Sequence, residues 1–243
     1  MKKIIALCGL LLLLVLAGCD TSSSSTETPP NIPQLLATAA DNMVSATTFQ
    51  LEITQSGTPH VFALAMAGTP VDVNFRRAIG QLISPDEIYA TASVIASNFP
   101  LELSIYGKGA DQWFNIGGIA WINGVFAEGF DPRRVVGENS GFRNVLTSLQ
   151  NVVYVGTQDL IGVQVHHITG IAEGVDITSL LVGMITFDTA LPVDIYIRAD
   201  NNFPIRVVIT QPDTATEETP NTQWTVDVFD FGGVKNFTAP TGA

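Results

Sequence analysis

Hydrophobic and polar residues alternate along five short segments of the chain, and this alternation predicts a sheet. A period of two is typical of a strand that buries one face and exposes the other. Strands with one solvated face pair most often as antiparallel sheets. The apolar positions of the five segments are Phe49, Leu51 and Ile53; Leu101, Leu103 and Ile105; Val193, Ile195 and Ile197; Ile205, Val207 and Ile209; and Trp224, Val226 and Val228.

A helical period precedes the first of these strands. Asn31 can cap a helix that has Pro33 in its first turn and Gln34 three residues after the cap. The spacing of the apolar residues places them on one stripe, which predicts an amphipathic helix. The stripe is formed by Ile32, Leu36, Ala39 and Met43.

Three shorter helical segments interrupt the strands. One is a turn that Asp131 caps and that ends before Gly137, and another begins after Asp176. Two of the three have apolar residues at helical spacing. These residues are Phe142, Val145, Leu146 and Leu149 in the earlier segment and Ile177, Leu180, Leu181 and Met184 in the later one. Because apolar helix stripes pack on the apolar face of a sheet, the pattern predicts a two-layered α+β domain.

Two connecting stretches differ from ordinary loops in opposite ways. Residues 60–68 are too apolar for a solvated loop. They form either a short buried strand or an apolar loop at a membrane or at a lipid entrance. Residues 211–222 are rich in Thr, Glu and Pro, which predicts a solvated loop between the last two strands.

The N-terminus has the three parts of a secretory signal. Lys2 and Lys3 are followed by an apolar run from Ile4 to Val15 and then by small residues. The run is shorter than the roughly 20 residues that a helix needs to cross a bilayer. We therefore expect residues 1–18 to be a cleaved signal peptide.

The cysteine that follows the signal is its most informative residue. Leu16-Ala17-Gly18-Cys19 resembles the bacterial lipobox, in which the thiol is alkylated by diacylglycerol and becomes the first residue of the mature chain. Simple cleavage that leaves Cys19 as a free thiol is the alternative. The other cysteine, Cys8, lies in the signal, so the mature chain has no internal disulfide. We expect residues 19–31 to be a lipidated cysteine with a flexible Ser-, Thr- and Pro-rich tether and residues 32–243 to be a single domain.

Charge narrows the possible partners. The chain has 11 basic and 23 acidic residues, and loss of Lys2 and Lys3 with the signal leaves 9 against 23, a formal charge of −14. Such an acidic protein repels phosphate backbones, so nucleic acid is not an expected partner. Hydrophobic residues make up 46% of the chain and charged ones 14%, which indicates a large interior or an apolar surface kept for a ligand.

Catalytic and metal-binding signatures are missing from the sequence. It has no G-x-S-x-G elbow, P-loop or C-x-x-C pair. His166 and His167 are adjacent in a predicted strand, where neighbours point to opposite faces, so they are not expected to share a metal ion. We expect no enzyme activity, no cofactor and no metal. A hydrolase built on two of the scattered carboxylates is the remaining enzymatic alternative.

Several stretches, taken in order, resemble the LppX/LprAFG lipoprotein family from about Ile32 to Pro240. None is a catalytic signature, and the resemblance rests on their order and spacing. The stretches are the lipobox, Thr48 to Leu51, Leu101 to Gly107 before Trp113-Phe114, Phe130 to Pro132 with Gly141-Phe142 and Val145-Leu146, Asp159 to Gly170, Pro192 to Ile197 and Phe203 to Arg206.

The resemblance implies a curved antiparallel half-barrel with helices on its concave face and an apolar cavity between the layers, as in the LolA and LolB carriers. It further implies a protein that binds and transfers lipid or glycolipid with acyl chains at the outer face of the cytoplasmic membrane. Cys19 would attach the protein to that membrane, and a membrane transporter is a candidate partner. A non-catalytic sensor or scaffold that binds a protein partner is the alternative function. The implied cavity wall is Leu101, Leu103, Ile105, Phe142, Val145, Leu146, Leu149, Ile177, Leu180, Leu181 and Met184.

The lipobox predicts a simple outcome for the loss of its thiol. Cys19→Ala should block acylation, because no other thiol remains near the cleavage site. Unprocessed precursor or a released domain should then replace the membrane-bound form when membranes are washed at alkaline pH. Full retention of the variant on washed membranes, after proven removal of the signal, would contradict the anchor assignment.

Overall fold

The computed structural model describes residues 29–66, 69–125, 127, 129–234 and 237–240. The expected signal peptide, Cys19 and most of the expected tether lie outside these residues. Within them the strands form one sheet of twelve. The strands are β1 Thr48–Ser56, β2 Val61–Met66, β3 Thr69–Ile83, β4 Glu87–Ala96, β5 Phe99–Lys108, β6 Asp111–Ile116, β7 Trp121–Asn123, β8 Gln150–Leu160, β9 Val163–Ala172, β10 Leu191–Arg198, β11 Pro204–Thr210 and β12 Gln223–Phe229.

The sheet is antiparallel and open. Its strand order is β7-β6-β5-β4-β3-β1-β12-β11-β10-β9-β8, and β2 pairs with the part of β3 that β1 leaves free. Most neighbours are joined by hairpins, whereas the pairing of β1 with β12 brings the two ends of the domain together in the middle of the sheet. The predicted antiparallel sheet is therefore confirmed, and β8 and β7 are the edge strands at its two ends.

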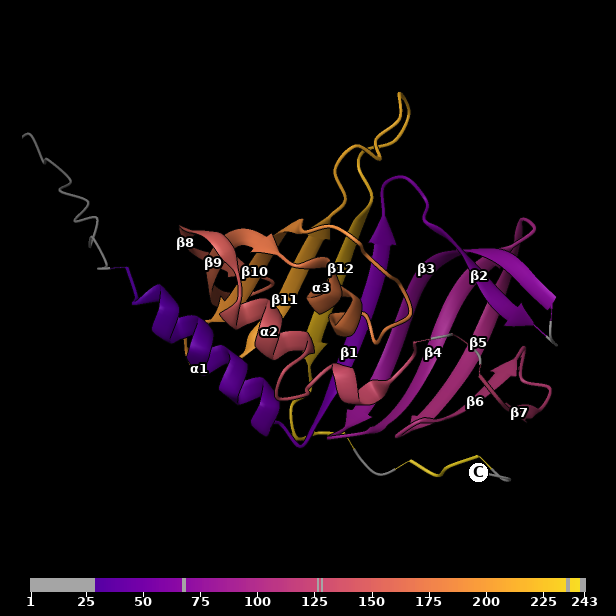
Figure 1. The fold of residues 1–243 in the computed structure, drawn as a ribbon. Coiled ribbons are helices and arrows are strands. Elements are labelled where there is room, and N and C mark those ends of the chain that lie inside the picture. The colour runs from indigo at the N-terminus through magenta and orange to yellow at the C-terminus, as the bar shows by residue number, and fades with distance from the viewer. Residues whose placement is uncertain (1–28, 67–68, 126, 128, 235–236, 241–243) are drawn as a thin grey trace, which may run out of the picture.

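Helices cover one face of this curved sheet (Figure 1). They are α1 Ile32–Ser45, α2 Gly141–Thr147 and α3 Gly174–Leu180, together with a single 3-10 turn, η1, at Pro132–Arg134. The caps follow the sequence: the Asn31 side chain accepts a hydrogen bond from the Gln34 amide at 3.2 Å, and Asp131 caps η1 through the Arg133 amide at 3.0 Å. The predicted α+β fold, with helices on the concave face, is confirmed.

Buried side chains from the two layers form one continuous core. Phe49, Trp224 and Val226 are fully buried on the sheet side, and Met43, Phe142 and Ile177 are fully buried on the helix side. Alternation places the polar neighbours of the strand residues on the opposite, solvated face. Burial of so much apolar area is the main stabilising contribution, at roughly 25 cal/mol per Å².

The two later helices end earlier than their apolar spacing predicts. α2 ends at Thr147, so Leu149 lies beyond it. α3 begins at Gly174, which puts Asp176 inside its first turn, and ends at Leu180, so that Leu181 and Met184 follow the helix. For α3 the reason is local: Val182 and Gly183 adopt left-handed backbone conformations, with φ of 60° and 77°, that stop a right-handed helix.

Two strand predictions are also settled. The apolar stretch 60–68 contains a strand, β2, rather than a loop, although Val61 at its start is 56% exposed. The prediction that Ile205 shares the core face with Val207 and Ile209 is wrong. A register shift opposite Tyr196 and Ile197 displaces the start of β11, and Ile205 lines a pocket together with Arg206 instead. Such a bulge places two successive side chains on the same face.

A close backbone approach holds the segment after α3 in place. A Cβ atom at Gly183 would collide with the carbonyl oxygen of Gly129. Gly183→Ala should therefore lower the free energy of unfolding by about 1–3 kcal/mol through this collision, in addition to the cost of the strained backbone. Gly232→Ala is the matched control, because Gly232 has nearly the same φ, 76°, with no atom within 4 Å of the added Cβ, and we expect it to cost only about 1 kcal/mol. Equal urea midpoints for the two variants would contradict the close approach.

Candidate functional site

An apolar groove lies where α1, α2 and the start of β8 meet. Its volume is about 480 Å³, which is within the range of about 300–1,000 Å³ for small-molecule pockets. No charged residue lines it, and Thr147 is its one side chain with a polar atom. The lining residues are Ile32, Pro33, Leu36, Ala37, Leu146, Thr147, Leu149 and Val152. Its chemistry suits a hydrocarbon chain and offers little to a charged ligand.

Local sequence explains why the groove forms at this place. The first turns of α1 carry no charged residue, so an aliphatic surface remains on the helix next to α2. The end of α2 at Thr147 releases Leu149 from the helix, and its side chain packs over Gly170 of β9, where a Cβ atom would collide with it. Gly170 therefore permits the close packing that forms the floor of the groove.

The structure gathers the eleven predicted cavity residues into the same core. Eight of them are buried: Leu103, Ile105, Phe142, Val145, Leu146, Ile177, Leu180 and Leu181. The other three, Leu101, Leu149 and Met184, are partly buried and pack against the core. Leu146 and Leu149 also line the groove. The eleven residues thus belong to, or pack against, one continuous interior in this structure.

Sequence reasoning missed one side of the groove. Ile32 and Leu36 were expected on the buried stripe of the first helix, whereas Pro33, Ala37 and Val152 carry no such signal. The available clue was the absence of charge from residues 29–40, which is unusual for exposed helical positions. The absence of charge indicates an apolar surface on the helix. It does not identify the strand that packs there, since that strand is more than 100 residues away in the sequence.

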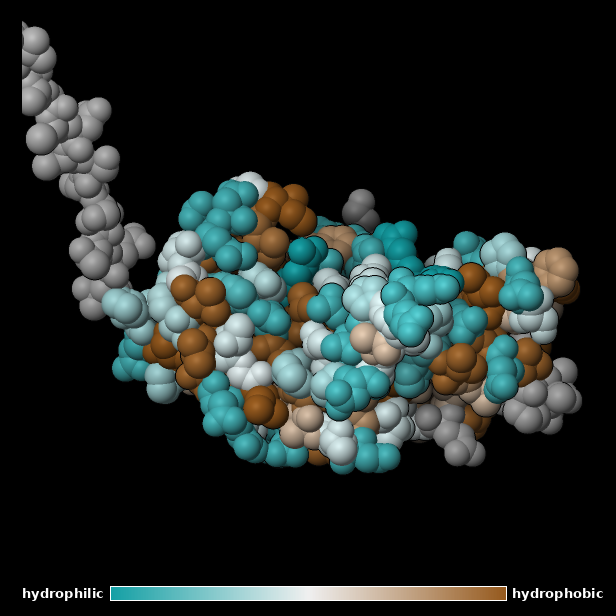
Figure 2. All heavy atoms as spheres, turned by 90° about the horizontal axis from the view of Figure 1, so that it is seen from above, coloured by the Kyte–Doolittle hydropathy of each residue, from teal (hydrophilic) through white to brown (hydrophobic). Residues whose placement is uncertain are grey.

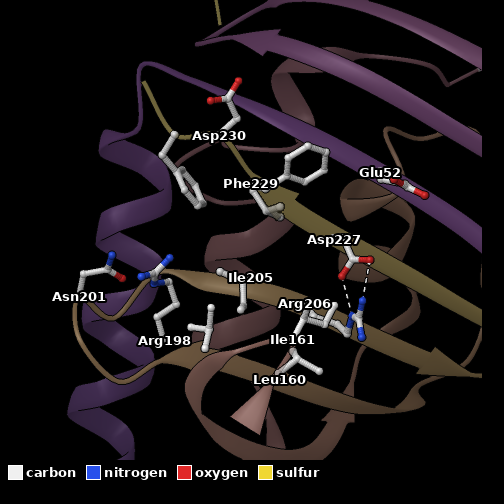
Figure 3. A pocket seen from close by; sticks show the side chains of 13 residues that line it. Glu52, Leu160, Ile161, Arg198, Asn201, Ile205, Arg206, Asp227, Phe229 and Asp230 are labelled. Carbon is white, nitrogen blue, oxygen red and sulfur yellow. Dashed lines mark hydrogen bonds and ion pairs between the residues drawn. The ribbon is translucent and has the colours of Figure 1, made fainter. Parts of the chain in front are cut away.

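A second pocket, of about 550 Å³, lies on the opposite face of the sheet (Figure 3). On its floor Arg206 donates two hydrogen bonds to Asp227, at 2.6 and 2.9 Å, and this pairing raises the pKa of the Arg206 guanidinium. Arg77 pairs in the same way with Glu52, and its hydrogen bond lowers the pKa of that carboxyl. Because Arg206 and Arg77 are paired with these carboxylates and Arg198 is paired with Asp200, the pocket has little free positive charge with which to attract an anion.

A third cleft, of about 610 Å³, lies beside the point where the described chain begins. Pro30 lines it together with Thr157 and Gln164 of the β8–β9 hairpin. His166 lies there too, and its Nδ1 is 3.1 Å from the Tyr154 hydroxyl. The described chain therefore begins next to this hairpin.

The histidine pair behaves as the strand period predicts. His166 contacts Tyr154, whereas the Nε2 atom of His167 lies 2.7 Å from Asp194 and its ring stacks on Tyr196. The two rings thus have separate partners from different strands. Among the described residues, no group of three or more His, Cys, Asp or Glu side chains is placed to hold a metal ion. The helices in that part of the chain are all too short or too polar to span a bilayer.

Comparison with known proteins identifies the fold. A model of the LppX_LprAFG lipoprotein family matches residues 33–233. The chain belongs to this family. Among solved structures, LprF from Mycobacterium bovis aligns with a TM-score of 0.60 at 14% identity, covering 87% of this chain and 98% of LprF. The Mycobacterium tuberculosis lipoprotein LppX aligns with a TM-score of 0.55 at 14% identity, covering 86% of this chain and 99% of LppX. Curated protein sequences give no match. The resemblance predicted from the ordered motifs is thus confirmed.

Proposed function

We propose that this lipoprotein binds a lipid or glycolipid through its acyl chains and transfers it at the outer face of the cytoplasmic membrane. The observation that carries the proposal is the uncharged aliphatic groove between α1 and α2 in a protein of this family. The groove serves as the entrance for an acyl chain. The eleven core residues, from Leu101 to Met184, form the wall that the chain reaches when helices and sheet move apart.

The physical role of such a protein is to lower the barrier to lipid movement. Each CH₂ group exposed to water costs about 0.8 kcal/mol, so a ~16-carbon chain costs on the order of 13 kcal/mol. A protein that shields the chain reduces this cost without making or breaking a covalent bond. This role needs no catalytic residues, and we propose none. A membrane transporter that receives the lipid is a candidate partner.

Anchoring at Cys19 keeps this activity local. Residues 20–31 give a tether of 12 residues, with a mean end-to-end distance of about 20 Å and a full extension of roughly 40 Å. The domain therefore stays close to its own bilayer, on the extracytoplasmic side of the membrane. Extraction and hand-off of lipid over this short distance fit the proposal better than free diffusion across a wide envelope.

A second candidate function is a scaffold or sensor that binds a protein partner. It is favoured by the closely packed core and by apolar side chains exposed at the far end of the sheet, where Phe99 is 73% and Ile119 88% exposed. Native mass spectrometry of the protein from a lipid-containing host, followed by extraction, separates the two functions. A co-purifying lipid supports the carrier, and a homogeneous lipid-free mass with no uptake of offered lipids rejects it.

Filling the groove should block lipid uptake without unfolding the protein. Ala37 is exposed on α1 and lines the groove, so Ala37→Trp places a ring where the acyl chain would enter. We expect lipid uptake to fall while the melting temperature of delipidated protein stays near that of the wild type. Gln34→Trp is the matched control, since Gln34 is exposed on the same helix but lines no part of the groove. Equal uptake by both variants would exclude the groove as the entrance.

Leu103→Trp tests the proposed wall. Leu103 is 3% exposed in the core, so the larger ring should lower the unfolding free energy of the delipidated protein by about 1–3 kcal/mol. If Leu103 also faces the acyl chain, lipid uptake falls as well. The measurement needs delipidated protein, because bound lipid raises apparent stability. Lower stability with full uptake would place Leu103 in the core alone and remove it from the wall.

A further inference from the structure

The free edge of the sheet at β8 carries an unusual number of exposed aliphatic side chains. Val152 is 39%, Val153 57% and Val155 55% exposed, and Ile161, in the turn that joins β8 to β9, is 82% exposed. We refer to these four residues as the β8 edge patch. Val152 also lines the groove with Ile32 and Pro33, so the patch is continuous with the start of α1. Figure 2 shows apolar side chains at the end of the molecule where the described chain begins.

The exposed residue Ile161 has a strained backbone conformation. Its φ is 55°, a left-handed conformation that β-branched residues rarely adopt and that turns usually assign to Asn or Gly. An exposed apolar side chain at such a position gains nothing from burial inside the domain. Strained residues of this kind concentrate at functional sites, where an external contact compensates for the strain.

Charge is almost absent from the segments that build this end. Residues 29–40 carry no charged residue, and residues 144–172 carry only Asp159. At the overall frequency of 14%, these 41 residues would carry about six charges. The Asp159 carboxylate is already engaged, since it accepts a hydrogen bond from the Gly162 amide at 2.9 Å. In a protein with many more acidic than basic residues, these segments can approach an anionic surface with little repulsion or loss of charge hydration. Charged side chains adjoin the patch on the side of Ile161 that lines the second pocket, with Glu52, Arg198, Arg206, Asp227 and Asp230.

The place where the proposed tether joins the domain indicates that the β8 edge patch faces the membrane. The described chain begins at residues 29–31, and Pro30 lies in a cleft with Thr157 and Gln164 of the β8–β9 hairpin. An anchor at Cys19 therefore holds the β8 edge patch, rather than the far end of the sheet, closest to the bilayer.

Pairing of β8 with a second copy is disfavoured by the shape of the strand. Its register with β9 shifts twice, between Gln150 and Val153 and between Tyr154 and Gly156. Asn151 and Gly156 have φ of 51° and 144°, which bends the strand at both places. Bulges of this kind interrupt the straight ladder of amide and carbonyl groups that edge-to-edge pairing requires.

We infer that the β8 edge patch, with Ile32 and Pro33, rests in the headgroup layer of the membrane that holds Cys19, so that the groove between α1 and α2 opens toward the bilayer. The inference rests on the proposed anchoring and lipid-binding function. The valine and isoleucine side chains enter the interface, while the peptide groups of the edge strand keep water and headgroups as partners. A lipid chain then has a short apolar path from the bilayer to the groove.

Site-specific labelling tests this orientation in the full-length lipidated protein. Cys19 carries the mature chain's one native thiol and acylation consumes it, so Val153→Cys introduces a unique reactive site. Ile119→Cys is the matched control at an exposed isoleucine of the far end, between β6 and β7. Each variant is labelled with bimane and floated on phosphatidylcholine vesicles with or without doxyl-labelled lipid. Because an interfacial surface lies about 5–10 Å into the headgroup boundary, the label at 153 should lose about half of its fluorescence and the label at 119 almost none.

The outcomes separate this inference from the function on which it rests. Equal quenching at both positions, no quenching at 153, or failure of the labelled protein to float overturns the orientation. Val155→Cys repeats the test if the first variant folds poorly. A dimer in analytical ultracentrifugation that Val153→Asp dissolves would assign the patch to a second copy and also overturn it. Quenching at 153 in a protein that takes up no lipid would support the orientation and reject the carrier function.

Discussion

The fold depends on covering the apolar concave face of an open sheet. Strands β3, β12 and β10 carry fully buried residues on that face, such as Leu82, Trp224 and Ile195. Exposure of this face to water would remove most of the stabilising burial. Three short helices and the segment after α3 supply the cover. Because the cover is made of separate pieces, seams remain between them, and the groove between α1 and α2 is one such seam. The candidate site is thus a consequence of how the core is closed.

The distribution of charge separates the surfaces of the molecule. On the solvated face of the sheet, Glu52 of β1 lies directly opposite Asp227 of β12, an arrangement that is unfavourable for like charges. Arg77 and Arg206 neutralise the two carboxylates with paired hydrogen bonds. Residues 29–40 and 144–172, by contrast, carry a single charged residue, Asp159. Under the proposed anchoring, this division would keep most of the repulsive charge away from the surface that faces the membrane.

The sequence predicted what depends on local pattern and missed what depends on register. Local patterns account for the alternating strands and for the helix cap at Asn31. The strand period also accounts for the separate partners of His166 and His167, because neighbouring strand residues point to opposite faces. The early ends of α2 and α3 and the displaced Ile205 depend on backbone turns and a bulge that apolar spacing does not encode. The residues of the predicted wall are buried because apolar stripes pack into the interior of the protein. The same stripe pattern would result from a filled core or from a cavity.

By itself, then, the sequence determined the α+β class, the two layers, the motifs of the LppX/LprAFG lipoprotein family and the shortage of charge at the N-terminal end of the domain. Only the tertiary structure decided that α1 lies against α2 and the start of β8, where Leu36, Leu149 and Val152 meet. It also decided that Pro30 lies beside the β8–β9 hairpin. The physical reason is that these contacts join segments more than 100 residues apart. Their positions follow from the packing of the whole core, which no local period specifies.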